Sequence, residues 1–145
     1  MYGIEVYGRA NHAILNKVQI QQNRSLKILY NKDFYTPTKQ LHKDLNVLMV
    51  KDIYKLSNAK FVYKYKNNLL PEIFENLFID NKHFYKYNTR QSNNIHLTKA
   101  NGKYGDMKIA HQGATIWNSL PLKIRNLKTV RNFSRKVKKA IIKSY

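Results

Sequence analysis

The C-terminal segment that follows Thr129 constrains the fold more than any other part of this sequence. Its apolar residues recur at helical spacing, at Val130, Phe133, Val137, Ala140 and Ile141. The other positions hold many cations and no carboxylate, the cations being Arg131, Arg135, Lys136, Lys138, Lys139 and Lys143. A helix lets the apolar stripe pack while the charged ends of Arg and Lys reach water or phosphate. We therefore expect a C-terminal helix that docks by one face and presents a positive surface on the rest.

The whole chain is strongly basic, and its charge indicates the class of partner. The 145 residues include 27 Lys and Arg against 8 Asp and Glu, for a net charge of +19. An excess of this size favours polyanions, because each phosphate contact releases counterions. We therefore expect the backbone of RNA or DNA as the partner. Two alternatives stay open: a merely solvated basic face, and the codon bias of an AT-rich genome that also raises Asn, Tyr and Ile.

Composition also excludes several classes of protein. The absence of cysteine excludes a disulfide framework and a zinc knuckle. No apolar run reaches the roughly 18 residues of a membrane span, and the N-terminus lacks the pattern of a signal peptide. The five histidines lie far apart in the sequence and match no zinc spacing. We expect an intracellular protein of the cytoplasm or nucleus, with no metal, no cofactor, no small-molecule substrate and no membrane partner.

The sequence also lacks the residue patterns of common enzymes. Metal-dependent nucleotidyl transfer needs carboxylates that converge on paired Mg²⁺ ions, and the sequence has no Asp-Asp or Asp-x-Asp pair. A Gly-x-Ser-x-Gly elbow and a phosphate-binding Gly-Lys-Ser/Thr ending are absent as well. We therefore expect that this chain alone is not an enzyme.

Periodicity predicts a mainly α fold: one small helical domain of about five helices, with a short β-hairpin near residues 94–110. Helices are expected at residues 12–31, at 49–68 and after Thr129. A further short helix is expected to have Thr36 as its N-cap and Pro37 as its first residue. A short buried helical turn is expected around Pro71. The hairpin is predicted because apolar and polar residues alternate in two segments, with Ile95 and Leu97 in the first and Met107 and Ile109 in the second. A glycine-containing turn lies between the two segments. The single domain 1–145 divides into a helical part (1–80), a loop and hairpin (81–111), and a tryptophan motif with the basic helix (112–145).

Two further groups of residues are candidates for specific roles. Trp117, the only tryptophan, has apolar neighbours, so we interpret it as a core anchor together with Pro121 and Phe133, although it could also stack on a base. Arg90 closes the stretch "HFYKYNTR", where aromatic and basic residues alternate in a predicted loop. Such a loop suits an unpaired strand, and packing by its own tyrosines explains it equally well. Arg90 is therefore a secondary nucleic-acid-binding candidate.

Several stretches occur in an order typical of one family. They are "YGIEVYG" (2–8), "LLPEIFENLF" (69–78), "YNTR" (87–90), "GATIWNSLP" (113–121) and the basic "FSRKVKKAII" (133–142). The sequence resembles the C-terminal region that follows the catalytic palm in non-LTR (LINE-like) retrotransposon reverse transcriptases. Tyr7 departs from the pattern, since a tryptophan is frequent there.

The resemblance implies a fragment of a larger reverse transcriptase polyprotein, itself an RNA-directed DNA polymerase from a transposable element. The family's polymerase aspartates lie upstream of this region, so no catalytic residue is carried over. The region is expected to be a non-catalytic accessory part that holds template RNA or target DNA through phosphate contacts. The alternative is a structural module that packs against the upstream polymerase domain, or a non-functional relic of a decayed element.

Overall fold

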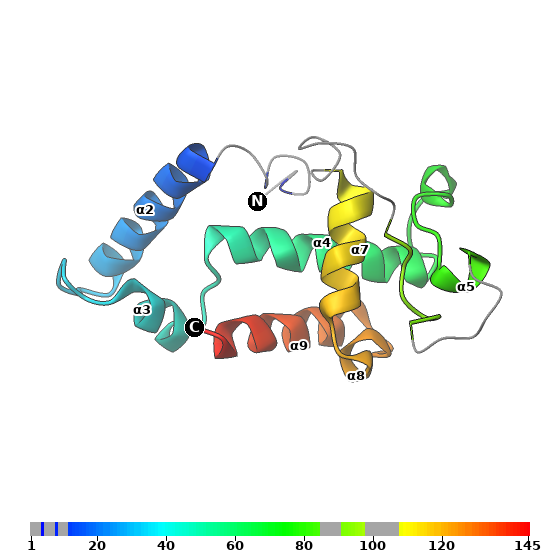
Figure 1. The fold of residues 1–145 in the computed structure, drawn as a ribbon. Helices are drawn as coiled ribbons and strands as arrows, with labels where there is room; N and C mark the ends of the chain where they lie inside the picture. The colour runs from blue at the N-terminus through cyan, green and yellow to red at the C-terminus, as the bar shows by residue number, and fades with distance from the viewer. Residues whose placement is uncertain (1–3, 5–7, 9–11, 85–90, 98–107) are drawn as a thin grey trace. The chain divides into compact units, whose positions relative to one another are not determined.

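The structure is a computed structural model that describes residues 4, 8, 12–84, 91–97 and 108–145. Its α-helices are α2 (His12–Leu29), α3 (Thr38–Asp44), α4 (Val50–Lys66), α5 (Asn81–Phe84), α7 (Ile109–Ser119), α8 (Leu122–Arg125) and α9 (Val130–Lys143), and a 3₁₀ helix, η1, spans Glu72–Phe74 (Figure 1). The described part of the chain is thus mainly helical, as predicted, with more helices than the five expected.

The chain divides into two compact units. Unit 1 consists of Met1–Leu56 and Ser134–Tyr145, and unit 2 of Ser57–Phe133. The boundaries between the units fall within α4 and within α9. The single domain expected from the sequence stays a prediction, and each unit is described by itself below.

Asparagines end three of the helices. Asn31, Asn46 and Asn68 follow α2, α3 and α4 and have positive φ angles of 48°, 53° and 53°. At each site the amide of the next residue donates to a carbonyl five residues earlier, over 2.8 Å at Lys32, 2.9 Å at Val47 and 2.9 Å at Leu69. These are Schellman caps, in which asparagine takes the left-handed position that glycine usually holds. They explain why α2 and α4 end close to the predicted Asn31 and Asn68.

The start of α3 differs from the prediction. Thr36 is not the N-cap; Pro37 holds that position, with ψ at 120°, and the helix begins at Thr38. The amide of Thr36 instead donates to the carbonyl of Asp33 over 3.0 Å, which places Thr36 in the preceding turn.

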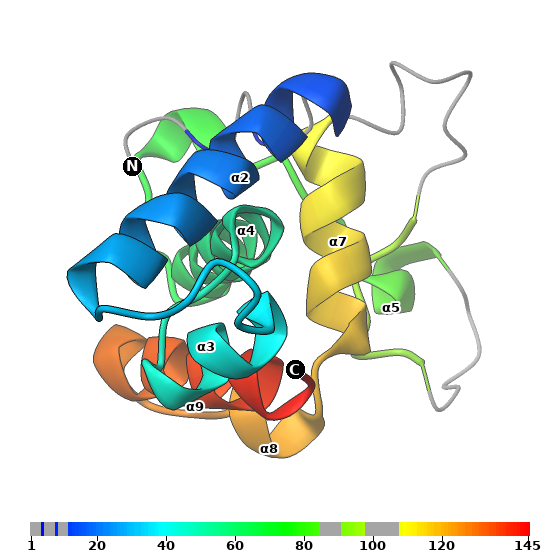
Figure 2. The ribbon, with the colours of Figure 1, turned by 90° about the vertical axis from the view of Figure 1, so that its left-hand side faces the viewer.

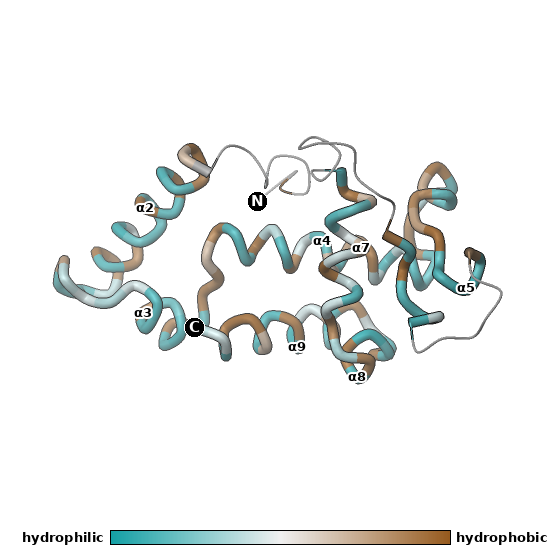
Figure 3. Tube along the Cα trace, in the orientation of Figure 1, coloured by the Kyte–Doolittle hydropathy of each residue, from teal (hydrophilic) through white to brown (hydrophobic). Residues whose placement is uncertain are grey.

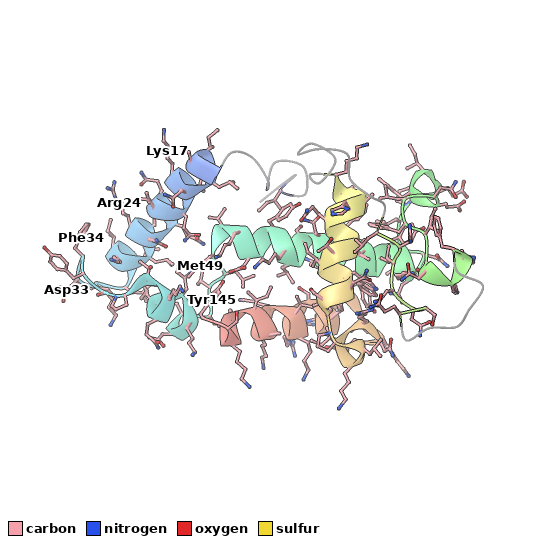
Figure 4. All side chains as sticks on the ribbon, viewed as in Figure 1. Lys17, Arg24, Asp33, Phe34, Met49 and Tyr145 are labelled. Carbon is pink, nitrogen blue, oxygen red and sulfur yellow. The ribbon has the colours of Figure 1, made fainter. Side chains whose placement is uncertain are left out.

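In unit 1, the N-terminus of α4 is capped by side chains from distant parts of the sequence. The Val50 amide donates to Gln19 Oε1 over 2.8 Å, and the Met49 amide donates to the Tyr145 hydroxyl oxygen over 3.0 Å (Figure 4). The Tyr145 hydroxyl in turn donates to Asp52 Oδ2 over 2.8 Å. Burial, together with the nearby Asp52 carboxylate, raises the pKa of Tyr145 well above its usual range. The hydroxyl therefore stays protonated and remains a donor to Asp52 at physiological pH.

A buried histidine connects α2 to α3 within unit 1. The side chain of His42 is fully buried, and its Nε2 lies 2.9 Å from Asn23 Oδ1 while its Nδ1 lies 3.1 Å from the Val47 carbonyl oxygen. The Gln22 amide donates to the Leu48 carbonyl over 2.9 Å beside it. These polar contacts fix the connection between α3 and α4 against α2.

Unit 2 is built around aromatic side chains and one glycine. The ring of Phe133, fully buried, lies 4.5 Å from that of Tyr63 and 6.0 Å from that of Trp117 between centroids. A Cβ added to Gly113 of α7 would lie 2.8 Å from Val62 Cγ2 and 3.0 Å from Phe78 Cζ. Only glycine therefore lets α7 approach these side chains so closely.

The predicted β-hairpin near residues 94–110 is wrong, since the described residues contain no strand. In its second half, Ile109 is the first residue of α7, while Met107 and the predicted turn lie outside the described residues. Its first half pairs with a side chain: the Ile95 amide donates to Asn118 Oδ1 over 3.0 Å, and Asn118 Nδ2 donates to the Ile95 carbonyl over 2.8 Å. An isolated antiparallel bridge to Asp80 completes the contacts of Ile95. The Asn118 amide thus takes the place of the partner strand.

The predicted buried turn around Pro71 is wrong in its burial. Pro71 caps η1, which contains no buried residue, and Ile73 is 86% exposed. Beyond it Phe78 is buried, and its ring packs 6.4 Å from that of Phe61. In residues 69–78, Phe78 therefore packs in the core of unit 2, whereas η1 contains no buried residue.

We predict that Asn118→Ala destabilises the protein by about 2 to 4 kcal/mol, because it leaves the buried amide and carbonyl of Ile95 without their partner. Urea denaturation followed by circular dichroism measures this change. Asn132→Ala, at an exposed position of α9, is the matched control and should change stability by less than about 0.5 kcal/mol. Equal stability of the two variants would show that Asn118 does not hold residues 94–96.

Candidate nucleic-acid interface

Helix α9 buries part of the apolar stripe that the sequence predicted and exposes most of its cations. Phe133 and Val137 are buried, Val130 and Ile141 are half-buried, and Ile142 is buried as well, whereas Ala140 is exposed. The cations Arg131, Arg135, Lys136, Lys139 and Lys143 are exposed, and Lys138 is half-buried. Figure 3 shows hydrophobic and hydrophilic residues alternating along α9, and Figure 4 shows side chains tipped with nitrogen extending from it.

Four of these cations form a row along the helix. Arg131, Arg135, Lys139 and Lys143 follow one another at intervals of four residues, so that neighbouring ones lie on one side, about 6 Å apart along the axis. Like charges at this spacing destabilise a helix by about 0.2 to 0.5 kcal/mol per pair. The described ion pairs, Lys55 with Asp52 and Lys66 with Asp80, involve none of them. The basic face therefore has uncompensated charge among the described residues.

Arg125 shows that not every basic residue near the C-terminus is available to a partner. Its Nε donates to the Leu120 carbonyl over 2.7 Å, its Nη2 to the Asn118 carbonyl over 2.7 Å and its Nη1 to Asn94 Oδ1 over 2.8 Å. The guanidinium also lies 5.9 Å from the Trp117 ring centroid, and partial burial lowers the pKa of Arg125. Arg125 is thus a structural cation that holds the end of α7.

The remaining candidates from the sequence lie apart from the α9 face. Trp117 is 5% exposed and packs within unit 2, so its ring offers no free face to a base. Pro121 is exposed and stands at the N-cap of α8, where its carbonyl accepts the Ile124 amide over 2.9 Å. Arg90 lies outside the described residues. Among the described candidates, the nucleic-acid-binding ones all lie on α9, and the anchors Trp117 and Phe133 pack together in unit 2.

A second exposed surface, at the turn between α2 and α3, was not among the predicted sites. Phe34 is 74% exposed and Tyr35 is 92% exposed, close to Lys27 at the end of α2. The sequence held one signal of it. A helix over residues 12–31 is predicted to place Leu15, Val18, Leu26 and Leu29 on one apolar face, and Ile20 and Ile28 fall outside that face. Both are exposed, at 40% and 79%. The predicted stripe itself is mostly in solvent, since of Leu15, Val18, Leu26 and Leu29 only Leu26 is buried.

The described residues contain no group of three or more His, Cys, Asp or Glu side chains placed to hold a metal ion. In the same part of the chain, every helix is too short or too polar to cross a bilayer.

Comparison with known proteins points to one class, the polymerases of mobile elements. The chain is 33% identical over 52 residues, or 36% of its length, to the probable RNA-directed DNA polymerase from transposon BS of Drosophila melanogaster. It is 34% identical over 70 residues, or 48% of its length, to the RNA-directed DNA polymerase from mobile element jockey of the same organism. The matches cover 6% and 7% of those proteins. No protein-family profile and no solved structure matches the chain.

These partial similarities to polymerases of non-LTR retrotransposons indicate a reverse-transcriptase-related origin for the chain. Because the chain spans only a small part of the length of these relatives, their polymerase activity is not transferred to it. The expected place of this region, downstream of the catalytic palm, stays a prediction.

We predict that two arginines near the C-terminus respond differently to the same substitution. Arg125→Gln should destabilise the protein by about 1 to 3 kcal/mol, because it leaves two backbone carbonyls and Asn94 without their donor. Arg135→Gln removes an exposed charge and should change stability by less than about 0.5 kcal/mol. Thermal and urea unfolding of both variants measure the difference. Equal losses would contradict the assignment of Arg125 as structural and Arg135 as free.

Proposed function

We propose that this chain is a non-catalytic, accessory nucleic-acid-binding region of a retrotransposon reverse transcriptase. It holds template RNA or target DNA through phosphate contacts made by α9. The residues that bind are Arg131, Arg135, Lys136, Lys138, Lys139 and Lys143, with Arg90 as a secondary contact. The upstream polymerase domain is its partner within the parent protein.

The observation that carries the proposal is the uncompensated row of cations on α9. A solvated helix usually intersperses carboxylates among its lysines, and such pairs stabilise it. The α9 row has like charges at i,i+4 instead, and a polyanion would relieve their repulsion while releasing its own counterions. Because Arg and Lys at this spacing contact phosphates, which are the same in every sequence, the binding has no sequence preference of its own.

The competing function is a packing module for the polymerase, and a specific observation favours it. Large apolar side chains are exposed in unit 2, with Ile73 at 86%, Leu122 at 58% and Leu69 at 57%. Exposed apolar residues often mark a surface that another protein covers. On this alternative the chain alone would self-associate and would bind nucleic acid only weakly. Size-exclusion chromatography and the binding measurements below separate the two functions.

We predict that the quadruple variant Arg135→Gln, Lys136→Gln, Lys139→Gln and Lys143→Gln folds normally and binds RNA and DNA more weakly. Each lost phosphate contact should flatten the slope of log K against log salt by about 0.7 on a single strand and 0.9 on a duplex. Four lost contacts should therefore reduce the slope by about 2.8 on a single strand and about 3.6 on a duplex. Fluorescence anisotropy over a range of salt concentrations measures the slope.

The matched control removes the same charge from another surface. Lys64, Lys82, Lys123 and Lys128 are exposed residues of unit 2, and their change to Gln should leave most of the affinity and the slope in place. If both quadruple variants lose affinity equally, the effect comes from net charge and not from α9. An unchanged slope in the α9 variant would mean that its basic face is only solvated.

We further predict that the chain, supplied with a primer-template, nucleotides and Mg²⁺ or Mn²⁺, extends no primer. The sequence has no Asp-Asp or Asp-x-Asp pair to hold the two ions that nucleotidyl transfer requires. A gel assay of labelled primer, with heat-treated protein as the background control, measures extension. Any extension above that background would contradict the non-catalytic assignment.

A further inference from the structure

The turn that follows α2 displays an unusual concentration of exposed apolar side chains. Phe34 and Tyr35 are 74% and 92% exposed, Ile28 is 79% exposed and Tyr30 is 50% exposed. Isolated exposed apolar residues are ordinary, but a cluster of large ones in a short segment marks a surface that has a ligand. Figure 2 shows α2 running into this turn before α3 begins, and Figure 4 labels Phe34 within it.

The aromatic rings of the turn are held in place although they are exposed. The Lys27 ammonium lies 5.3 Å from the Phe34 ring centroid and also donates a hydrogen bond to the Phe34 carbonyl. The Tyr35 ring meets the Phe34 ring edge to face, with centroids 5.6 Å apart. The Schellman cap at Asn31 fixes where the chain leaves α2. Rings that are already positioned lose little conformational entropy when a flat ligand stacks on them.

Charge around these rings identifies the kind of ligand. A groove of about 670 Å³ lies beside them, with Ile20, Ile28 and Phe34 among its apolar walls and Arg24, Lys27 and Lys32 as its cations. Asp33, also exposed, is the carboxylate of the turn, so the cations are in excess. A ligand that suits this surface has flat apolar faces and negative charge in the same molecule. Single-stranded nucleic acid has both, since its unpaired bases stack and its phosphates are anionic.

We infer that this surface, here called the turn platform (Arg24, Lys27, Lys32, Phe34 and Tyr35), stacks unpaired bases of single-stranded RNA or DNA. The inference rests on the proposed partner, nucleic acid, but on a different surface from α9 and on a different interaction. The α9 face attracts phosphates of any strand, whereas the turn platform requires bases that are free of a duplex. The two surfaces together would favour a single strand over a duplex of equal charge.

The decisive probe is a pair of single-stranded oligonucleotides of equal length, one of oligothymidine and one with abasic sites throughout. Both have the same phosphates, so any preference for the first measures base stacking. The wild-type chain should bind oligothymidine roughly 5-fold to 100-fold more tightly than the abasic strand. The double variant Phe34→Leu and Tyr35→Leu keeps the surface apolar but removes both rings, and it should lose this preference while binding the abasic strand as before.

Two further variants make the result specific. Leu29→Ala changes a residue that is 75% exposed at the end of α2 and does not line the groove, so it should keep the wild-type preference. Phe34→Trp places an indole on the platform, and its fluorescence should be quenched by oligothymidine but not by the abasic strand. The single native tryptophan, Trp117, is 5% exposed and gives a constant background.

The outcomes separate this inference from the proposed function of α9. Suppose that the α9 quadruple variant binds as wild type while the Leu double variant loses its base preference. Base stacking on the turn platform is then supported, and the proposed phosphate binding by α9 is contradicted. If the wild-type chain shows no preference for bases, or the Leu double variant retains it, the turn platform is overturned. Retention of the preference together with loss of self-association in the Leu double variant would assign the surface to a protein partner instead.

Discussion

The structure depends on how backbone N–H and C=O groups at helix ends and at Ile95 are satisfied without a partner strand or a glycine. A buried or terminal N–H or C=O without a partner costs as much as a lost hydrogen bond, so every helix end needs a solution. Here Asn31, Asn46 and Asn68 take left-handed conformations after three helices. Gln19 caps α4, and Asn118 pairs with both backbone groups of Ile95. The position of each unit's helices follows from these bonds together with the apolar core.

The stretches that carry the family resemblance are mainly architectural where the structure describes them. In "YGIEVYG", Ile4 is buried and a Cβ added to Gly8 would overlap the Tyr54 ring. In "GATIWNSLP", Gly113 allows close approach of α7, Trp117 is buried and Asn118 binds Ile95. Such residues keep a fold, and they carry no chemistry of their own. A resemblance that rests on these positions therefore does not identify a functional site.

Periodicity in the sequence predicted α2, α4 and α9 well, but it missed α7 and predicted the pairing of short segments poorly. The pattern of α9 is local, so spacing alone predicted where it begins and that it has a basic face. The hairpin failed because alternation at Ile95 and Leu97 indicates an extended segment but cannot say what pairs with it, and Asn118 is distant in sequence. Likewise, nothing in the sequence distinguishes the role of Arg125 from that of Arg135. Only the fold shows that the first is bound to carbonyls and the second reaches solvent.

Segregation of charge on α9 is weaker support for binding than it first looks. Burying a lysine costs so much that any helix with a buried stripe keeps its lysines on the other face, whether or not a partner exists. A codon bias toward lysine would give the same separation. The informative feature is the spacing of Arg131, Arg135, Lys139 and Lys143, because repulsion along that row costs helix stability and no described carboxylate relieves it. The turn platform adds a second, independent surface, in which Phe34 and Tyr35 are held in solvent beside cations. The case for nucleic acid is therefore stronger from these two surfaces together than from the net charge of the chain.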